Sequence, residues 1–211
     1  MIITRGRTKR VMYSSELQKI VNMLRMYGME QAKEARTPLA VLLVGMNGEG
    51  YETIVTNYQQ LGGQLLYIST IVRPDVARAA ATLSRYMSMP GEVHWNAAVS
   101  VLRYLKKTKT YVLCPGRLSE EVIAKYELTG FCDSDYAMDK DTRRSRTRYL
   151  FLFNGSLVSW YNKLQTTIAC SIVEVEYMAI SACVKEGLWL RNLMGSLLDK
   201  SWNNIQIYND N

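Results

Sequence analysis

Apolar residues recur at helical spacing through the first half of the chain. An i, i+3, i+4, i+7 stripe that begins at Leu17 predicts a helix, which Ser14 or Ser15 can cap. Pro74 stands at the favoured first-turn position of another helix. The remaining helices of this half are expected over residues 58–71 and 94–108. We therefore expect residues 1–108 to form a helical domain.

The apolar pattern changes in the second half, where short apolar runs alternate with turn residues. Asn154-Gly155 predicts the turn of a hairpin, and a long helix is expected from Ser171. Strands are expected over residues 126–133, 149–153, 157–161 and 205–210. Strands, then a helix, then a strand that returns beside the first predict an α/β domain with a mixed sheet and a covering helix. This domain is expected over residues 109–211.

One carboxylate lies on the apolar face of the long helix. At 3.6 residues per turn, Glu176 shares the side expected to pack on the sheet. The residues on that side are Ile172, Ile180, Cys183 and Gly187. Glu174 has a simpler role, because Ser171-x-x-Glu174 is a capping box. An inward acid is costly unless a cation meets it, so Glu176 is a candidate ligand.

Two further acids complete a candidate metal site. Asp133 and Asp210 lie at the predicted ends of strands, and Glu176 comes from the covering helix. Carboxylate oxygens suit Mg²⁺, and a pair of such ions can hydrolyse a phosphodiester without a histidine or cysteine nucleophile. Aspartates at strand ends are equally often simple turn formers. Asp135 is expected to form a turn or to support the site from behind the metal ligands, and Asp139 and Asp141 are expected to be solvated loop charges.

The net charge of +7 on 211 residues favours an anionic partner such as nucleic acid, although a solvated basic surface explains the charge equally well. The candidate phosphate contacts are Arg103, Lys106, Lys107, Arg143 and Arg144. The single histidine, His94, is expected at a helix start or in the core rather than in catalysis. No C-x-x-C pair occurs among the four cysteines, which argues against a zinc finger and favours buried free thiols in a reducing compartment.

No stretch is apolar enough to span a membrane or to serve as a signal peptide, so we expect an intracellular protein, cytoplasmic or nuclear.

Several short motifs occur along the chain, and their order and spacing are more specific than any one of them. In the second half they are Phe131-Cys-Asp-Ser-Asp-Tyr-Ala137, Val158-Ser-Trp160, Lys163-x-Gln165, Ser171-x-x-Glu-x-Glu-Tyr177 and Tyr208-Asn-Asp-Asn211. In the first half they include Thr37-Pro38, Gly62-Gly-Gln-Leu-Leu-Tyr67, Arg73-Pro-Asp75 and His94-Trp95.

These motifs resemble the Pol polyproteins of copia-type retrotransposons. The first half resembles the thumb and connection at the end of the reverse transcriptase, and the second half resembles the ribonuclease H domain. The resemblance implies that Asp133, Glu176 and Asp210 are metal-binding catalytic acids that use Mg²⁺ or Mn²⁺. The implied reaction is hydrolysis of the RNA strand of an RNA–DNA hybrid, with other parts of a Pol polyprotein as further partners.

The chain also departs from this family. The family's fourth acid and its histidine-bearing loop would follow Asn211, which implies a C-terminally truncated ribonuclease H domain with impaired activity. The paired aspartates of the polymerase palm are missing, which excludes polymerase activity. Arg148 stands where the family usually has glycine. The alternative is a non-catalytic nucleic-acid-binding or inert retrotransposon remnant.

Overall fold

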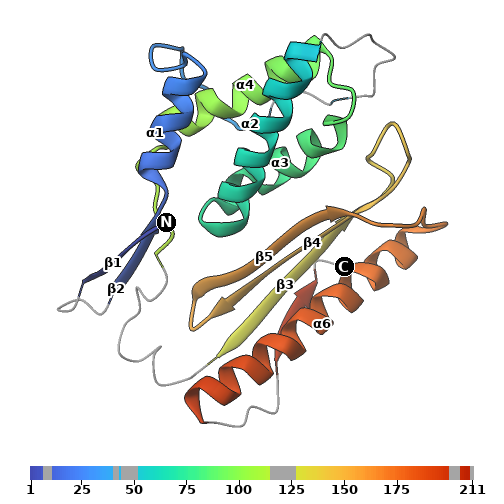
Figure 1. Ribbon diagram of the computed structural model, residues 1–211. Coiled ribbons are helices and arrows are strands. Elements are labelled where there is room, and N and C mark those ends of the chain that lie inside the picture. The colour runs from blue at the N-terminus through green and yellow to red at the C-terminus, as the bar shows by residue number, and fades with distance from the viewer. Residues whose placement is uncertain (7–10, 40–42, 44–51, 115–126, 200–204, 210–211) are drawn as a thin grey trace. The chain divides into compact units, whose positions relative to one another are not determined.

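The chain combines α-helices with two β-sheets. The computed structural model describes residues 1–6, 11–39, 43, 52–114, 127–199 and 205–209 (Figure 1). Within these residues there are five α-helices, a two-stranded sheet and a four-stranded mixed sheet. Two compact units divide the chain, one formed by Met1–Thr4 with Tyr13–Leu113 and the other by Arg5–Met12 with Cys114–Asn211. The expected α/β class is confirmed.

The first unit is mainly helical. Its elements and the N-terminal sheet are β1 (Ile2–Gly6), β2 (Val11–Ser15), α1 (Leu17–Met26), α2 (Glu52–Ile71), the 3-10 turn η1 (Pro74–Val76), α3 (Ala77–Leu83), the 3-10 turn η2 (Ser84–Tyr86) and α4 (Glu92–Lys107). The four predicted helices are therefore confirmed, and Pro74 does open its helical segment. The two strands were not predicted. Because Ser14 and Ser15 belong to β2, Glu16 is the N-cap of α1 and neither serine serves there.

Helix α2 passes through the core of the first unit. Tyr58, Leu61 and Leu65 on this helix are fully buried, and the Tyr58 hydroxyl donates to the Leu83 carbonyl oxygen at 2.8 Å. His94 is also fully buried; its ring stacks on Tyr86 with 4.1 Å between centroids. Its Nδ1 accepts a hydrogen bond from the Gly91 N–H at 2.9 Å, which caps α4. The structural role expected for His94 is confirmed.

The second unit is a sheet covered by one long helix. Its elements are β3 (Leu128–Asp135), β4 (Arg146–Phe153), β5 (Ser156–Leu164), α6 (Ile172–Leu198) and β6 (Gln206–Asn209). The strand order is β5-β4-β3-β6, with β3 and β6 parallel and the other pairs antiparallel. Asn154 and Gly155 have φ of 48° and 74°, as the predicted tight hairpin turn requires. The mixed sheet and its covering helix are thus confirmed (Figure 1).

Phe151 fills the space between the sheet and α6. Its ring is fully buried with Cys183 and Leu190 of α6. Two glycines make room for it: a Cβ at Gly130 would lie 2.6 Å from the ring, and a Cβ at Gly187 would lie 3.2 Å from it. Burial also raises the pKa of the Cys183 thiol to about 12. Helix α6 can approach β3 closely only because Gly130 and Gly187 lack a side chain.

Gly130→Ala is expected to lower the free energy of unfolding by about 1–3 kcal/mol, because the added methyl collides with the buried Phe151 ring. Urea unfolding of the full chain measures the change. The control is Gly63→Ala in α2, where a Cβ meets nothing within 4 Å; alanine favours a helix by up to about 1 kcal/mol over glycine. Equal stability of the Gly130→Ala variant and the parent chain would contradict the close packing.

Candidate functional site

The candidate acids come from neighbouring elements of the second unit. Asp133 lies in β3 and Glu176 lies in the first two turns of α6. Asp210 lies outside the described residues and directly follows Asn209, the last residue of β6. Strands β3 and β6 run parallel, with Cys132 opposite Asn209. The strand that carries Asp133 and the strand that leads to Asp210 are therefore direct neighbours.

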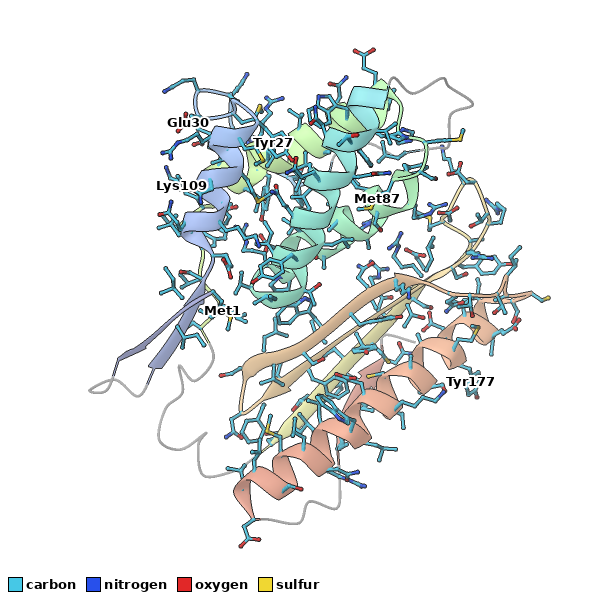
Figure 2. The ribbon with its side chains drawn as sticks, viewed as in Figure 1. Met1, Tyr27, Glu30, Met87, Lys109 and Tyr177 are labelled. Carbon is cyan, nitrogen blue, oxygen red and sulfur yellow. The ribbon has the colours of Figure 1, made fainter. Side chains whose placement is uncertain are left out.

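The start of α6 is fixed by its cap. The Ser171 hydroxyl accepts a hydrogen bond from the Glu174 N–H at 3.1 Å, and the Glu174 carboxylate accepts one from the Cys170 N–H at 2.7 Å. The capping role predicted for Ser171 and Glu174 is confirmed. Val175 then turns inward and is fully buried, whereas Tyr177 projects from the helix into solvent (Figure 2). Glu176 lies between them and is half-buried.

Both carboxylate oxygens of Glu176 have neutral donors. The Ser134 hydroxyl of β3 donates to Oε1 at 2.6 Å, and the Asn209 amide of β6 donates to Oε2 at 3.2 Å. Ser134 directly follows Asp133, and Asn209 directly precedes Asp210. The helix glutamate is therefore bonded to the two strands at positions adjacent to both predicted aspartates.

Asp133 points to the other face of the sheet. Side chains alternate along a strand, and both Cys132 and Ser134 contact α6 or its core. Asp133 consequently faces away from α6, where Arg148 lies directly opposite it on β4. The Arg148 guanidinium is 2.8 Å from Asp133 Oδ2 and 3.9 Å from Asp135 Oδ2. The structure thus bonds Glu176 to Ser134, the residue after Asp133, while the Asp133 carboxylate is paired with a cation on the other face of the sheet.

Only Glu176 among the three candidate acids is a described carboxylate on the helix side of the sheet without a basic partner. Glu176 is a half-buried carboxylate, and within the described ranges no basic side chain forms an ion pair with it. Such a group favours a nearby positive charge, and Mg²⁺ prefers carboxylate oxygens while retaining water ligands. No group of three or more His, Cys, Asp or Glu side chains suited to a metal occurs among the described residues. The third acid, Asp210, is outside that set.

The basic residues singled out in the sequence divide into two kinds. Arg103 Nε donates to the Lys33 carbonyl oxygen at 2.5 Å, and Lys106 Nζ donates to the Ala32 carbonyl oxygen at 2.8 Å. These two side chains of α4 therefore fasten a loop within the first unit. The exposed members are Lys107, Arg143 and Arg144. Phosphate binding by any of the five stays a prediction.

Several acids and thiols differ from the sequence expectation. Asp139 is not a solvated charge: it is buried, and its Oδ1 accepts from the Thr142 N–H at 2.8 Å and the Thr142 hydroxyl at 2.9 Å. This local turn explains the burial. Asp135 accepts a hydrogen bond from the Arg146 N–H at 3.0 Å, in line with a supporting role. All four cysteines are free, but only Cys132 and Cys183 are buried.

Sequence reasoning missed the partners of the acids. Neither the Ser134 and Asn209 contacts to Glu176 nor the Arg148 pair with Asp133 was predicted. Side chains alternate along β3, so Ser134 shares a face with the apolar Cys132 and not with Asp133. This pattern could have predicted that Ser134 faces the helix. The Arg148 partnership depends on the strand register, which the sequence pattern leaves open.

Comparison with known proteins decides the family. The chain is 37% identical over 205 residues to the retrovirus-related Pol polyprotein from transposon TNT 1-94 of Nicotiana tabacum, a match that covers 93% of this chain. It is 32% identical over 142 residues, 67% of this chain, to the corresponding polyprotein from transposon RE2 of Arabidopsis thaliana. The chain belongs to the copia-type retrotransposon Pol polyproteins. The expected membership is confirmed.

This Pol chain spans a small part of those relatives, 15% of the TNT 1-94 polyprotein and 9% of the RE2 polyprotein. It is also 43% identical over 133 residues to the secreted RxLR effector protein 161 of Plasmopara viticola, covering 63% of this chain and 90% of that protein. No family model matches the chain, and no solved structure matches it. None of the described helices has the length and apolar character needed to cross a membrane.

Proposed function

We propose that the second unit is a ribonuclease H-type module that hydrolyses the RNA strand of an RNA–DNA hybrid. The family resemblance implies that Asp133, Glu176 and Asp210 would hold the divalent ions, Mg²⁺ or Mn²⁺, whereas in this structure the Asp133 carboxylate lies on the other face of the sheet, paired with Arg148. Bound ions of this kind supply an activated water and stabilise the leaving 3′ oxygen. The observation that carries the proposal is the bonding of Glu176 to Ser134 and Asn209, the sequence neighbours of the two aspartates.

The protein's own residues would orient the reaction centre. Ser134 and Asn209 hold both Glu176 oxygens and so fix the direction of its carboxylate. The packing of α6 on Phe151 keeps this glutamate against β3 and β6. Arg143 and Arg144 lie exposed in the loop that follows β3, after the end of the strand that carries Asp133, where they suit contacts with hybrid phosphates.

Cleavage of a labelled RNA–DNA hybrid by the purified full chain tests the proposal. With Mg²⁺ or Mn²⁺ present, we expect RNA fragments that end in a 3′ hydroxyl, and no cleavage of the DNA strand. Glu176→Gln should lower the rate at least about 100-fold, because loss of a metal ligand exceeds the 10–100-fold cost of altering a group that only supports one. Removing the metal with a chelator should have the same effect.

Glu174→Gln is the matched control. It makes the same chemical change two residues away on the same helix, and glutamine can still accept the capping hydrogen bond from Cys170. This variant should cleave like the parent chain. Equal cleavage by parent and Glu176→Gln, or none by a folded parent chain, contradicts the nuclease assignment. Hybrid binding without metal that falls steeply with salt would then favour the non-catalytic alternative.

A further inference from the structure

Two thiols meet in the core between the sheet and α6. Cys132 lies in β3 and Cys183 lies in α6; both side chains are buried, and both thiols are free. They belong to one apolar cluster together with Phe151. Cys114 and Cys170, by contrast, are not buried. The buried cysteines are therefore a pair that joins a strand to the helix covering it.

The packing of α6 on β3 brings the two cysteines opposite each other. Gly130 and Gly187 both lie against the Phe151 ring, so the strand and the helix approach closely at that point. Cys132 is two residues farther along the strand, and Cys183 is one helical turn back along α6. These two steps have nearly the same length, about 6–7 Å. The cysteines thus occupy matching positions one step away from the glycines.

Contacts around the pair support this placement. Ser134, the next residue on the same face of β3, donates to the Glu176 carboxylate of α6 at 2.6 Å. The Cys132 thiol donates to the Tyr208 carbonyl oxygen at 3.6 Å. Burial raises the pKa of the Cys183 thiol, and Cys132 raises it further through its charge and a side-chain hydrogen bond. The two thiols are therefore within hydrogen-bonding reach of each other.

We propose that Cys132 and Cys183 form a reversible disulfide that fixes α6 to β3 when the protein meets hydrogen peroxide. One thiol breaks the oxygen–oxygen bond of the peroxide and becomes a sulfenic acid, and a molecule of water leaves. The second sulfur then displaces the hydroxyl group as a second molecule of water, and the sulfur–sulfur bond forms. The thiols lose two electrons in total, which reduce the peroxide. This reaction is independent of the proposed nuclease activity.

Burial determines both the rate and the consequence of this reaction. The thiolate is the form that attacks an oxidant, so a buried thiol with a raised pKa reacts more slowly than an exposed one. Hydrogen peroxide is small and uncharged, which lets it reach a core position that a larger oxidant cannot enter. The new bond closes residues 132–183 into a loop and removes conformations from the unfolded chain. The oxidised protein is therefore more stable than the reduced one.

Peroxide treatment of the folded full chain tests the proposal, in a Cys114→Ser/Cys170→Ser background that removes the two other thiols. Peptide mapping by mass spectrometry without a reductant should find the peptides of Cys132 and Cys183 linked. The thermal midpoint should rise by at least about 5 °C, and dithiothreitol should restore the original value. This reversal separates the disulfide from methionine sulfoxide, whose reduction requires dedicated enzymes.

Cys183→Ala in the same background is the matched control, and Cys132→Ala is a second variant that removes the pair from the strand side. Neither variant should show the linked peptides or the reversible rise in thermal midpoint. Unlinked cysteines in the treated folded protein overturn the proposal, and so does a link that forms only in urea. A reversible rise that persists in either folded alanine variant also overturns it, because the stabilisation then has another source.

Discussion

Arg73→Met is expected to destabilise the first unit by about 3–5 kcal/mol, because it leaves a partly buried carboxylate without its cation. Arg73 is almost fully buried, and its Nε and one terminal nitrogen donate to the two oxygens of Asp75 at 2.9 and 2.7 Å. The guanidinium also donates to the Thr108 carbonyl oxygen at 3.1 Å and to its hydroxyl at 2.5 Å. One side chain thus ties the start of η1 to the end of α4.

The pH dependence gives this prediction a second readout. Burial acts to raise the pKa of Asp75, but the hydrogen bonds and charge of Arg73 outweigh it and hold that pKa below its usual value. A lowered pKa contributes stability above the ordinary carboxyl pKa of about 4, and this contribution disappears as pH falls through the folded-state value. The difference in free energy of unfolding between the parent chain and Arg73→Met should therefore become smaller below about pH 4.

Urea unfolding at neutral and acidic pH measures both effects. Arg25→Met is the control: Arg25 is mostly exposed and lies 3.5 Å from Glu30, so its loss should cost no more than about 1 kcal/mol. Arg73→Lys should also be destabilised, because an ammonium cannot form the same two-pronged contact with Asp75. If Arg73→Met lowers the free energy of unfolding no more than Arg25→Met does, the Arg73–Asp75 ion pair contributes little to stability.

Phe151→Ala is expected to lower the free energy of unfolding by about 3–5 kcal/mol, because apolar burial is lost and a cavity remains. The ring is fully buried, and it contacts Tyr149 edge-on with 5.9 Å between centroids. Gly130 and Gly187 lie next to the ring and have no side chain, so neither offers atoms that could fill the space. Since this contact docks α6 on the sheet, the variant should also loosen the position of Glu176.

Leu150→Ala controls for the loss of an apolar side chain from β4. Leu150 is the preceding residue, is 37% exposed and lies on the face away from Phe151. We expect its cost to remain below about 1.5 kcal/mol, since much of its side chain is already in water. Chemical unfolding followed by circular dichroism compares the two variants. Similar costs would contradict the assignment of Phe151 as the centre of this core.

Local sequence signals predicted much of the fold. Ser171 and Glu174 determine where α6 begins through hydrogen bonds within one turn, and Asn154-Gly155 forms the hairpin turn through positive φ angles. The burial of His94 beside its own cap likewise depends on neighbours close in sequence. These features were predictable because each involves residues only a few positions apart.

The errors have a common physical origin. Strands β1 and β2 were missed, because a short ribbon depends on pairing between segments rather than on the pattern within one. Asp139 was taken for a solvated charge, although its Thr142 partner lets the carboxylate be buried. For the candidate site, the 3.6-residue period of the helix identified Glu176. The sequence pattern does not specify which residue of a neighbouring strand donates a hydrogen bond to its carboxylate.

The sequence by itself determined the family, the order of the helices, the order of the strands in the second unit, and the identity of the candidate acids. Tertiary structure decided which groups meet these acids. It joined Glu176 to Ser134 and Asn209, and it placed Arg148 against Asp133. The reason is that strand register and helix docking bring together residues far apart in the chain, and a shift of one residue would exchange the two faces of the sheet.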